Sequence, residues 1–293
     1  MQRGLRLKSE NTIHIETKTA SYSRRGSRLA QHKKKYSSII IKGAGLLDET
    51  RALLSNWDSS LSTDGNFERA QRDNIFAKVS RKRTIQVLRI LRRRYFNETE
   101  IAQSLVILEK EGLSRDAQKS ILYFLTAQSD PLLRDAVAEI VSPFAGQGRR
   151  EMEVDELVSA LRLWVTDGRM TTAWNDKTLI RTANGILTAL RDFGILQGLA
   201  DKRLAPVYLP VSAFAFIAFL LLKKTGSPAD VLHSSEWSLF LLSLQDVEKL
   251  FLEAHQRKLL TYHAAGSVIR ITFSENSPEV FAHALAQREN QDS

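Results

Sequence analysis

The stretch that most constrains the fold runs from Lys78 to Tyr95 and has the sequence KVSRKRTIQVLRILRRRY. Apolar residues recur in it at helical spacing, namely at Ile85, Leu88, Leu91 and Tyr95. A polar and basic stripe falls on the opposite side, made of Lys82, Gln86, Arg89 and Arg93. This pattern predicts one amphipathic helix, with its apolar side packed on a core. Its basic side then forms a rod of charge roughly 20 Å long at 1.5 Å per residue.

The same stretch is unusually rich in cations. Between Arg81 and Arg94 it contains no acid and these basic residues: Arg81, Lys82, Arg83, Arg89, Arg92, Arg93 and Arg94. A rod of this kind fits a phosphate backbone, because bound cations release condensed counterions from nucleic acid. A solvated helix face that only adds solubility gives the same pattern. The candidate nucleic-acid contacts in this stretch are Arg81, Lys82, Arg89, Arg92 and Arg93.

Charge is spread unevenly along the 293 residues, whose formal net charge is +9. Residues 1–35 hold ten Lys or Arg and two Glu, so this segment carries +8, while the rest is nearly neutral. The segment is polar and aperiodic, which predicts a basic flexible arm. The chain has no cysteine, and this excludes disulfides, zinc–cysteine sites and thiol catalysis.

One apolar run, Val207–Leu222, bears on whether the chain enters a membrane. Pro210 interrupts it, and it is shorter than the roughly 20 residues that a membrane-spanning helix needs. We therefore expect a buried core helix from Val211 and no membrane partner. No apolar segment typical of a signal peptide occurs before residue 39, so a cytoplasmic location is expected.

The order of helix-forming and turn-forming segments predicts a mainly α protein with three parts after the arm. Residues 36–144 have the pattern of an all-helical bundle with short connections, including helices at Gly43–Trp57, from an Asn66 cap to Lys78, and from an Asp130–Pro131 start to a stop at Pro143. Residues 150–210 give a helix, a turn, a second helix and two β-prone pieces, Ile195–Leu196 and Val207–Leu209, an order typical of a winged helix.

Residues 211–293 repeat this plan. Ser243 and Asp246 form a capping-box-like helix start, a hairpin is expected around residues 264–267, and a short helix near residues 278–286 is followed by a fraying end.

The second predicted site lies in the 150–210 unit. On the helix Asp176–Phe193 an outward arc contains Lys177, Arg181, Asn184, Thr188 and Arg191. Such cationic, amide and hydroxyl groups contact phosphates and base edges in DNA. Lys202 and Arg203 are expected at the tip of the wing, where phosphates pass. Two alternatives stay open, because any surface helix turns polar residues outward and many winged helices bind proteins.

Motifs for catalysis were sought, and none was found. The chain has no phosphate-binding glycine loop, nucleophile elbow or HExxH motif. Its six histidines are scattered, and no carboxylate stands at ligand spacing from His255 and His263. We therefore expect no catalytic residue, no metal, no cofactor, no small-molecule substrate and no enzymatic activity.

The chain resembles the BrxA family, accessory proteins of the BREX phage-defence systems, from about Tyr36 to Phe273. The resemblance rests on the opening YSS…KGAGLLDET, on RKRTIQVLRILRRRY, and on W-x-x-K-T…LRDFGIL between Trp174 and Leu196. It implies a cytoplasmic, non-enzymatic protein that binds double-stranded DNA and helps the system restrict phage and mark host DNA. It also implies a NusB-like helical front and other BREX components as partners. The alternatives are a protein–protein adaptor within the BREX complex and an RNA-binding NusB-like protein.

Overall fold

The computed structural model describes residues 36–170, 173–199, 201–266 and 268–292. The chain divides into two units, Met1–His32 and Lys33–Ser293, and only the second contains described residues. The predicted arm at 1–35 lies outside them.

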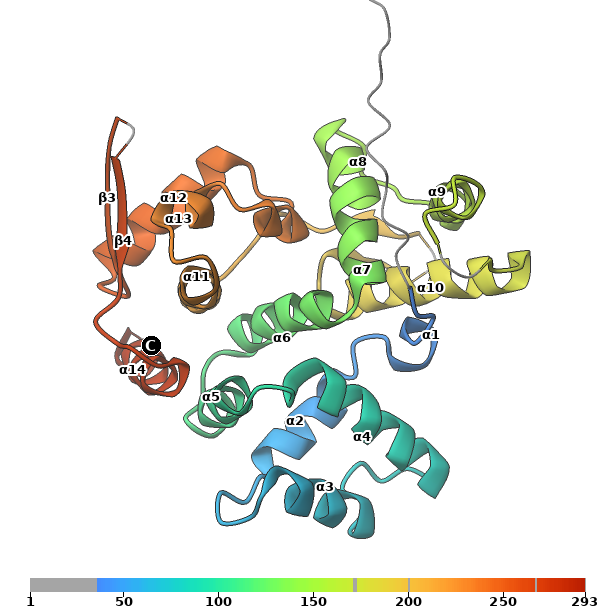
Figure 1. Ribbon diagram of the computed structural model, residues 1–293, viewed down its shortest axis with the longest axis horizontal. Coiled ribbons are helices and arrows are strands. Elements are labelled where there is room, and N and C mark those ends of the chain that lie inside the picture. Colours follow the sequence, from blue (N-terminus) through green and yellow to red (C-terminus); the bar gives the residue numbers. More distant parts are fainter. Residues whose placement is uncertain (1–35, 171–172, 200, 267, 293) are drawn as a thin grey trace, which may run out of the picture. The chain divides into compact units, whose positions relative to one another are not determined.

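The first half of the described chain is a series of short helices (Figure 1). Their bounds are α1 (Ile40–Gly43), α2 (Leu47–Ser55), α3 (Thr63–Arg72), α4 (Arg81–Tyr95), α5 (Thr99–Lys110), α6 (Arg115–Ser129), α7 (Pro131–Ala136) and α8 (Ser142–Gly146). A single π-helical turn, Val137–Val141, joins α7 to α8.

The second half adds two small hairpins to further helices. Its elements are α9 (Val154–Thr166), α10 (Asp176–Asp192), β1 (Leu196–Gln197), β2 (Arg203–Leu204), α11 (Val211–Thr225), α12 (Pro228–Leu232), a 3₁₀ helix (Ser235–Phe240), α13 (Leu244–Gln256), β3 (Thr261–Ala265), β4 (Val268–Thr272) and α14 (Pro278–Asp292). Strands β1 and β2 pair antiparallel, as do β3 and β4. The predicted mainly α fold is confirmed.

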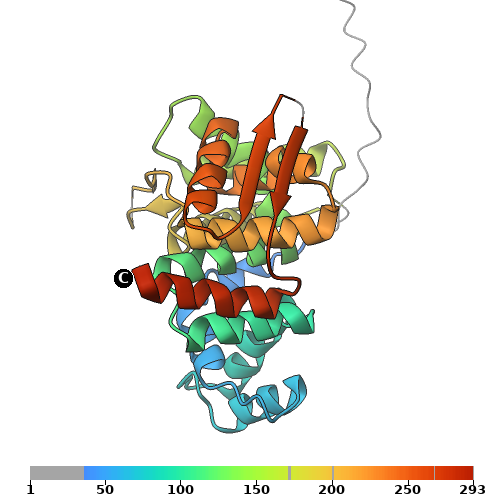
Figure 2. The same ribbon diagram turned by 90° about the vertical axis from the view of Figure 1, so that its left-hand side faces the viewer.

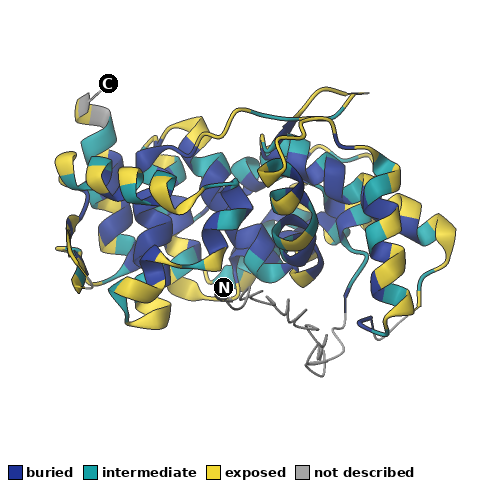
Figure 3. Cartoon of the chain, turned by 90° about the horizontal axis from the view of Figure 1, so that it is seen from above, coloured by how far each residue is buried: buried dark blue, intermediate teal, exposed yellow. Residues whose placement is uncertain are grey.

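Helix α11 is the core helix that the apolar run predicts. It packs against α6, α13 and α14, and Phe214, Phe216 and Ile217 on it are fully buried. Figure 3 shows the dark blue buried positions on the inner sides of the helices and the yellow exposed positions on their outer sides. In the described part of the chain, no helix has the length and apolarity that crossing a membrane would require.

Helix α14 differs from its prediction. We expected a short helix near residues 278–286 followed by a fraying end, but α14 continues to Asp292 and lies alongside α5 (Figure 2). Phe281 is fully buried and stacks on Phe219 of α11 with ring centroids 5.0 Å apart. One hydrophobic cluster, running from Tyr36 to Leu285, therefore crosses the predicted boundaries near residues 144–150 and 210.

Two predictions near the start of the chain were wrong. The helix expected over Gly43–Trp57 is shorter, because α1 ends at Gly43 and α2 covers only Leu47–Ser55. Leu46, directly before α2, has a left-handed backbone with φ of 50°. Asn66 does not cap a helix. Ser62 caps α3 by accepting a hydrogen bond from the Gly65 amide, while the buried Asn66 side chain bonds the backbone of Asp58.

Later caps and strands were predicted with mixed success. Asp130 followed by Pro131 starts α7, and Ser243 with Asp246 forms the expected capping box of α13. Pro143 does not end its helix. It lies in α8, which continues directly from the π-helical turn Val137–Val141. The second strand of the first hairpin is Arg203–Leu204 and not Val207–Leu209.

Candidate nucleic-acid interface

The N-terminal half of α4 presents an exposed basic face. Val87, Leu88 and Leu91 are buried in the core, and this turns Arg81, Lys82 and Arg89 outward to solvent. Within the described residues, no hydrogen bond or ion pair joins these three side chains to another group. Ile85, which we expected on the inner side, is 36% exposed beside them. We call Arg81, Lys82 and Arg89 the α4 basic face.

The position of these cations is electrostatically unfavourable for the helix itself. The first turn of α4 holds Arg81, Lys82 and Arg83 and no acid. The N-terminus of a helix carries partial positive charge, so each surface cation there costs about 0.3–1 kcal/mol at low salt. Arg83 offsets part of this by donating to the Lys42 carbonyl at 2.7 Å and to Gln86 at 2.8 Å.

The C-terminal half of α4 uses its arginines to hold the fold. Arg92 pairs with Asp64 at 2.5 Å and lies over the Phe67 ring at 4.4 Å. Arg93 donates to the Ser129 carbonyl at 2.9 Å. Arg94 is 7% exposed and donates to the carbonyls of Gly43 at 2.6 Å and Gly45 at 3.3 Å. The predicted continuous rod is therefore divided, and Arg92 and Arg93 are bound within the protein.

Helix α10 is positioned by its cap and its apolar side. The Asn175 side chain accepts a hydrogen bond from the Thr178 amide at 2.9 Å. Leu179, Ile186 and Leu190 are buried, and the helix packs against α9. Lys177, Arg181 and Asn184 are exposed, as predicted, and the Asn184 side chain donates to the Ile180 carbonyl at 2.9 Å.

The remainder of the α10 polar face is covered by α1, which lies between α10 and α4 (Figure 1). Thr188 is half-buried, and Gly45 donates its amide hydrogen to the Asp192 carboxylate at 3.0 Å. Arg191 is also half-buried and pairs with Asp192 at 2.9 Å. The prediction that Thr188 and Arg191 face freely outward was wrong. The KGAG turn at residues 42–45, which covers them, gives no periodic signal that would reveal this contact.

The first hairpin places one of its two cations in a strand and the other in the connecting loop. Arg203 lies within β2, opposite Gln197, and its guanidinium pairs with Glu151 at 2.8 Å. Lys202 ends the loop between β1 and β2, is half-buried, and its carbonyl accepts a backbone hydrogen bond from Met152 at 2.9 Å. The expected position at the tip of the wing was therefore wrong for Arg203.

A buried polar network fixes α9 and the loop after it to the front helices. Tyr36 donates to Asp135 at 2.6 Å and stacks on Trp164 of α9 at 5.7 Å. Arg169 pairs with Asp135 at 3.3 Å and with Glu139, and its guanidinium lies 4.1 Å from the Trp164 ring. Burial, and then the bond to Asp135, raise the pKa of the Tyr36 hydroxyl well above its usual range. Nothing in the sequence spacing indicates this network.

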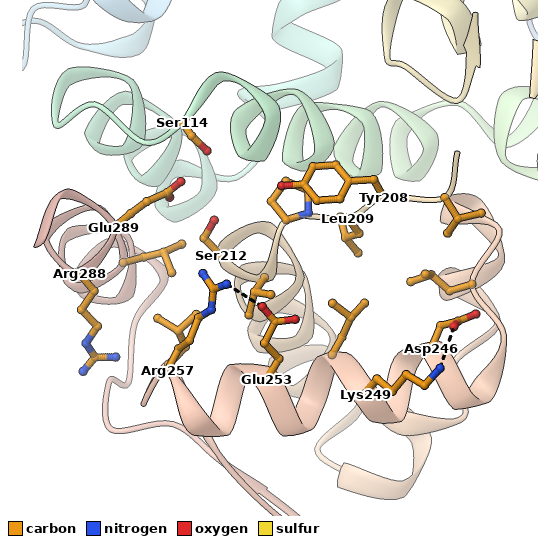
Figure 4. Close-up of a pocket in the computed structure, with 17 residues that line it drawn as sticks. Ser114, Tyr208, Leu209, Ser212, Asp246, Lys249, Glu253, Arg257, Arg288 and Glu289 are labelled. Atoms are coloured by element: carbon orange, nitrogen blue, oxygen red, sulfur yellow. Dashed lines mark hydrogen bonds and ion pairs between the residues drawn. The ribbon is translucent and has the colours of Figure 1, made fainter. Parts of the chain in front are cut away.

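A hollow of about 540 Å³ lies between α13, α14 and the segment before α11 (Figure 4). Its charges pair among themselves, with Arg257 at 2.7 Å from Glu253 and Lys249 at 3.9 Å from Asp246. His255 and His263 lie with ring centroids 5.5 Å apart. The described residues contain no group of three or more His, Asp or Glu that could hold a metal ion. The hollow therefore shows no excess of charge for a ligand.

Comparison with known proteins identifies a family and a protein of similar fold. The family model described as BrxA matches residues 34–220. A crystal structure of an uncharacterized protein from Magnetospirillum magneticum is 14% identical, with a TM-score of 0.53. The match covers 71% of this chain and 98% of that one, and at this identity it shows a shared fold alone. No curated protein matches.

Proposed function

Because the chain belongs to the BrxA family and is therefore a BREX-associated protein, we propose that it binds double-stranded DNA through the α4 basic face. In this proposal it is an accessory protein of phage defence that acts in the cytoplasm, where the DNA is. Its role is to bind, and the enzymatic steps belong to other BREX components.

The observation that carries the proposal is that Arg81, Lys82 and Arg89 are exposed and unpaired within the described part of the chain. The first and the last of them are eight residues apart on α4, or roughly 12 Å at 1.5 Å per residue. Over that length a DNA duplex carries about seven phosphate charges. Cations near the positive end of the helix dipole contribute little to the stability of the fold. Binding of a polyanion would explain why they are present.

Helix α10 supplies a second set of suitable groups. Lys177, Arg181 and Asn184 are exposed and are of the types that contact phosphates and base edges. The +8 segment at residues 1–35 lies outside the described residues, and we propose that it adds sequence-independent attraction to the duplex.

A titration of labelled duplex DNA at several salt concentrations tests this function. With three or more phosphates neutralised, the logarithm of the association constant should fall with the logarithm of salt concentration at a slope of about −2.7 or steeper. A response to salt that is flat between 50 and 200 mM, roughly the range in which counterion release is visible, would exclude the proposal. Competition with duplex RNA of the same length separates DNA binding from the RNA-binding alternative.

One observation favours a protein–protein adaptor as the second candidate. Leu163 on α9 is 60% exposed and Ile180 on α10 is 46% exposed, so the 150–210 unit shows apolar surface next to its polar groups. An adaptor that uses this unit would keep its DNA affinity when Leu163 and Ile180 are both changed to serine, and it would lose co-purification with another BREX component. Loss of DNA affinity with intact co-purification would exclude it.

A further inference from the structure

The contact between α1 and α10 determines how α10 can meet a duplex. Ile40–Gly43 lies against the middle of α10, at Gly185. A Cβ atom added to Gly185 would stand 3.2 Å from the backbone of Ile41, so α1 approaches α10 about as closely as a glycine allows. Beyond this point the chain of residues 44 and 45 continues along the helix to Asp192.

Helix α1 is held in this place from the opposite side. Arg94 binds the carbonyls of Gly43 and Gly45, and Arg83 binds that of Lys42. A Cβ atom at Gly43 would lie 2.8 Å from the Ile90 side chain, and Ile40 is fully buried. These contacts fix α1 to α4, in addition to its packing on α10.

Because of this contact, the width of the major groove limits how much of α10 can bind in it. The groove of B-DNA is about 12 Å wide and admits one α-helix, whose diameter with side chains is about 10–12 Å. A helix with a second segment of backbone against its face does not fit along that groove. Before Gly185, the side chains of Lys177, Arg181 and Asn184 are exposed, and the last two border the hollow that α10 forms with α1. Beyond Gly185, Thr188 is half-buried in the same hollow.

We propose that α1 is a fixed steric stop that confines DNA contact on α10 to the part of the helix before Gly185. The inference rests on the proposed DNA binding and specifies which residues of α10 contact the DNA. Arg181 and Asn184 contact the groove, and Lys177 contacts the backbone. Thr188 and Arg191 make no contact with DNA, and Asp192, which binds Arg191, serves to hold Gly45.

A matched pair of substitutions on the same helix tests the stop. Arg181→Ala should lower duplex affinity at least about fivefold, the lower end of what one good arginine–base contact contributes. Arg191→Ala should leave affinity within about twofold, because its side chain is half-buried and its guanidinium is engaged by Asp192. Circular dichroism and melting temperature serve as fold controls for both variants.

Cysteine chemistry provides a readout that does not depend on affinity, since the chain has no native cysteine. In the full-length protein, a thiol at Asn184→Cys should react several-fold more slowly with a maleimide when saturating duplex is present. A thiol at Thr188→Cys should react at the same rate with and without duplex. Protection at both positions, or equal loss of affinity for Arg181→Ala and Arg191→Ala, would overturn the stop while leaving DNA binding established. Failure of the unmodified protein to bind duplex would remove the proposed function and the stop together.

Discussion

Helices α4 and α10 carry similar polar stripes in the sequence, but the fold uses them differently. On α4, Arg81, Lys82 and Arg89 are exposed and have no partner in the part of the chain that the structure describes, whereas the C-terminal cations are bound to the protein. On α10 the exposed polar residues are again N-terminal, while Thr188 and Arg191 are half-buried. The turn at residues 42–45 lies against both helices and binds Arg94 of α4 and Asp192 of α10, whereas other elements bind Arg92 and Arg93.

The largest effect is expected from Arg94→Leu, which breaks the contact between α4 and this turn. The change leaves the carbonyls of Gly43 and Gly45 buried without their donor, at a cost of about 2–4 kcal/mol in the free energy of unfolding. It also removes one of the two arginines that lower the pKa of the buried Asp130 carboxyl, a pKa that burial raises. Denaturant unfolding measures the loss.

The matched control for Arg94→Leu is Arg89→Leu on the same helix. Arg89 is exposed and has no partner in the described part of the chain, so its loss should change the free energy of unfolding by less than about 0.5 kcal/mol. Equal destabilisation by the two substitutions would contradict the division of α4 into a free half and a bound half.

A smaller loss of stability is expected from Tyr36→Phe, which weakens the attachment of α9 to the front helices. Removing the hydroxyl leaves Asp135 with one fewer hydrogen bond, which costs about 1–2 kcal/mol in the free energy of unfolding. If the substitution leaves the unfolding midpoint unchanged, the network does not hold the two regions together.

The same hydroxyl predicts how stability depends on pH. Because the pKa of Tyr36 is higher in the folded than in the unfolded protein, its contribution is complete below about pH 10 and is lost as pH rises above that value. Burial raises the pKa values of Tyr95 and Tyr123 in the same direction, so all three add to the alkaline loss. Tyr36→Phe should therefore reduce, but not abolish, the loss of stability at high pH. The free energy of unfolding at pH 8 and at about pH 11 measures this loss.

The smallest effect is expected from Arg92→Ala, which separates pairing from DNA binding within α4. The Arg92 and Asp64 side chains are 43% and 74% exposed, so the lost pair costs about 0.2–1 kcal/mol of stability. Because Arg92 is engaged by Asp64 and Phe67, duplex affinity should stay within about twofold. A tenfold loss of affinity would place Arg92 in the interface after all.

The sequence predicts the elements better than it predicts which faces they leave open. Helical spacing correctly places α4, α10 and the buried core helix α11, because local periodicity follows from each segment itself. It does not show that Arg94 is buried, since a basic residue beside two exposed ones has the same pattern whether it meets solvent or a backbone carbonyl.

The missed contacts have one feature in common, which is long separation along the chain. Gly45 meets Asp192, Tyr36 meets Asp135, and α14 lies on α5, and none of these pairs is visible in local spacing. The close approaches at Gly43, Gly45 and Gly185 offer a weak signal in hindsight, because each glycine stands where a side chain would collide with a neighbouring element. Only the assembled structure tells which glycines these are.

The most direct test of the α4 basic face compares the salt dependence of duplex binding for two double variants. Arg81→Ala with Arg89→Ala removes two free cations, and Arg92→Ala with Arg93→Ala removes two cations that the protein itself binds. The first pair should reduce the slope of log affinity against log salt by about two, and the second pair should leave it unchanged within experimental scatter. Equal slopes for both pairs, or a smaller slope only for the second, would contradict the assignment of DNA binding to the α4 basic face.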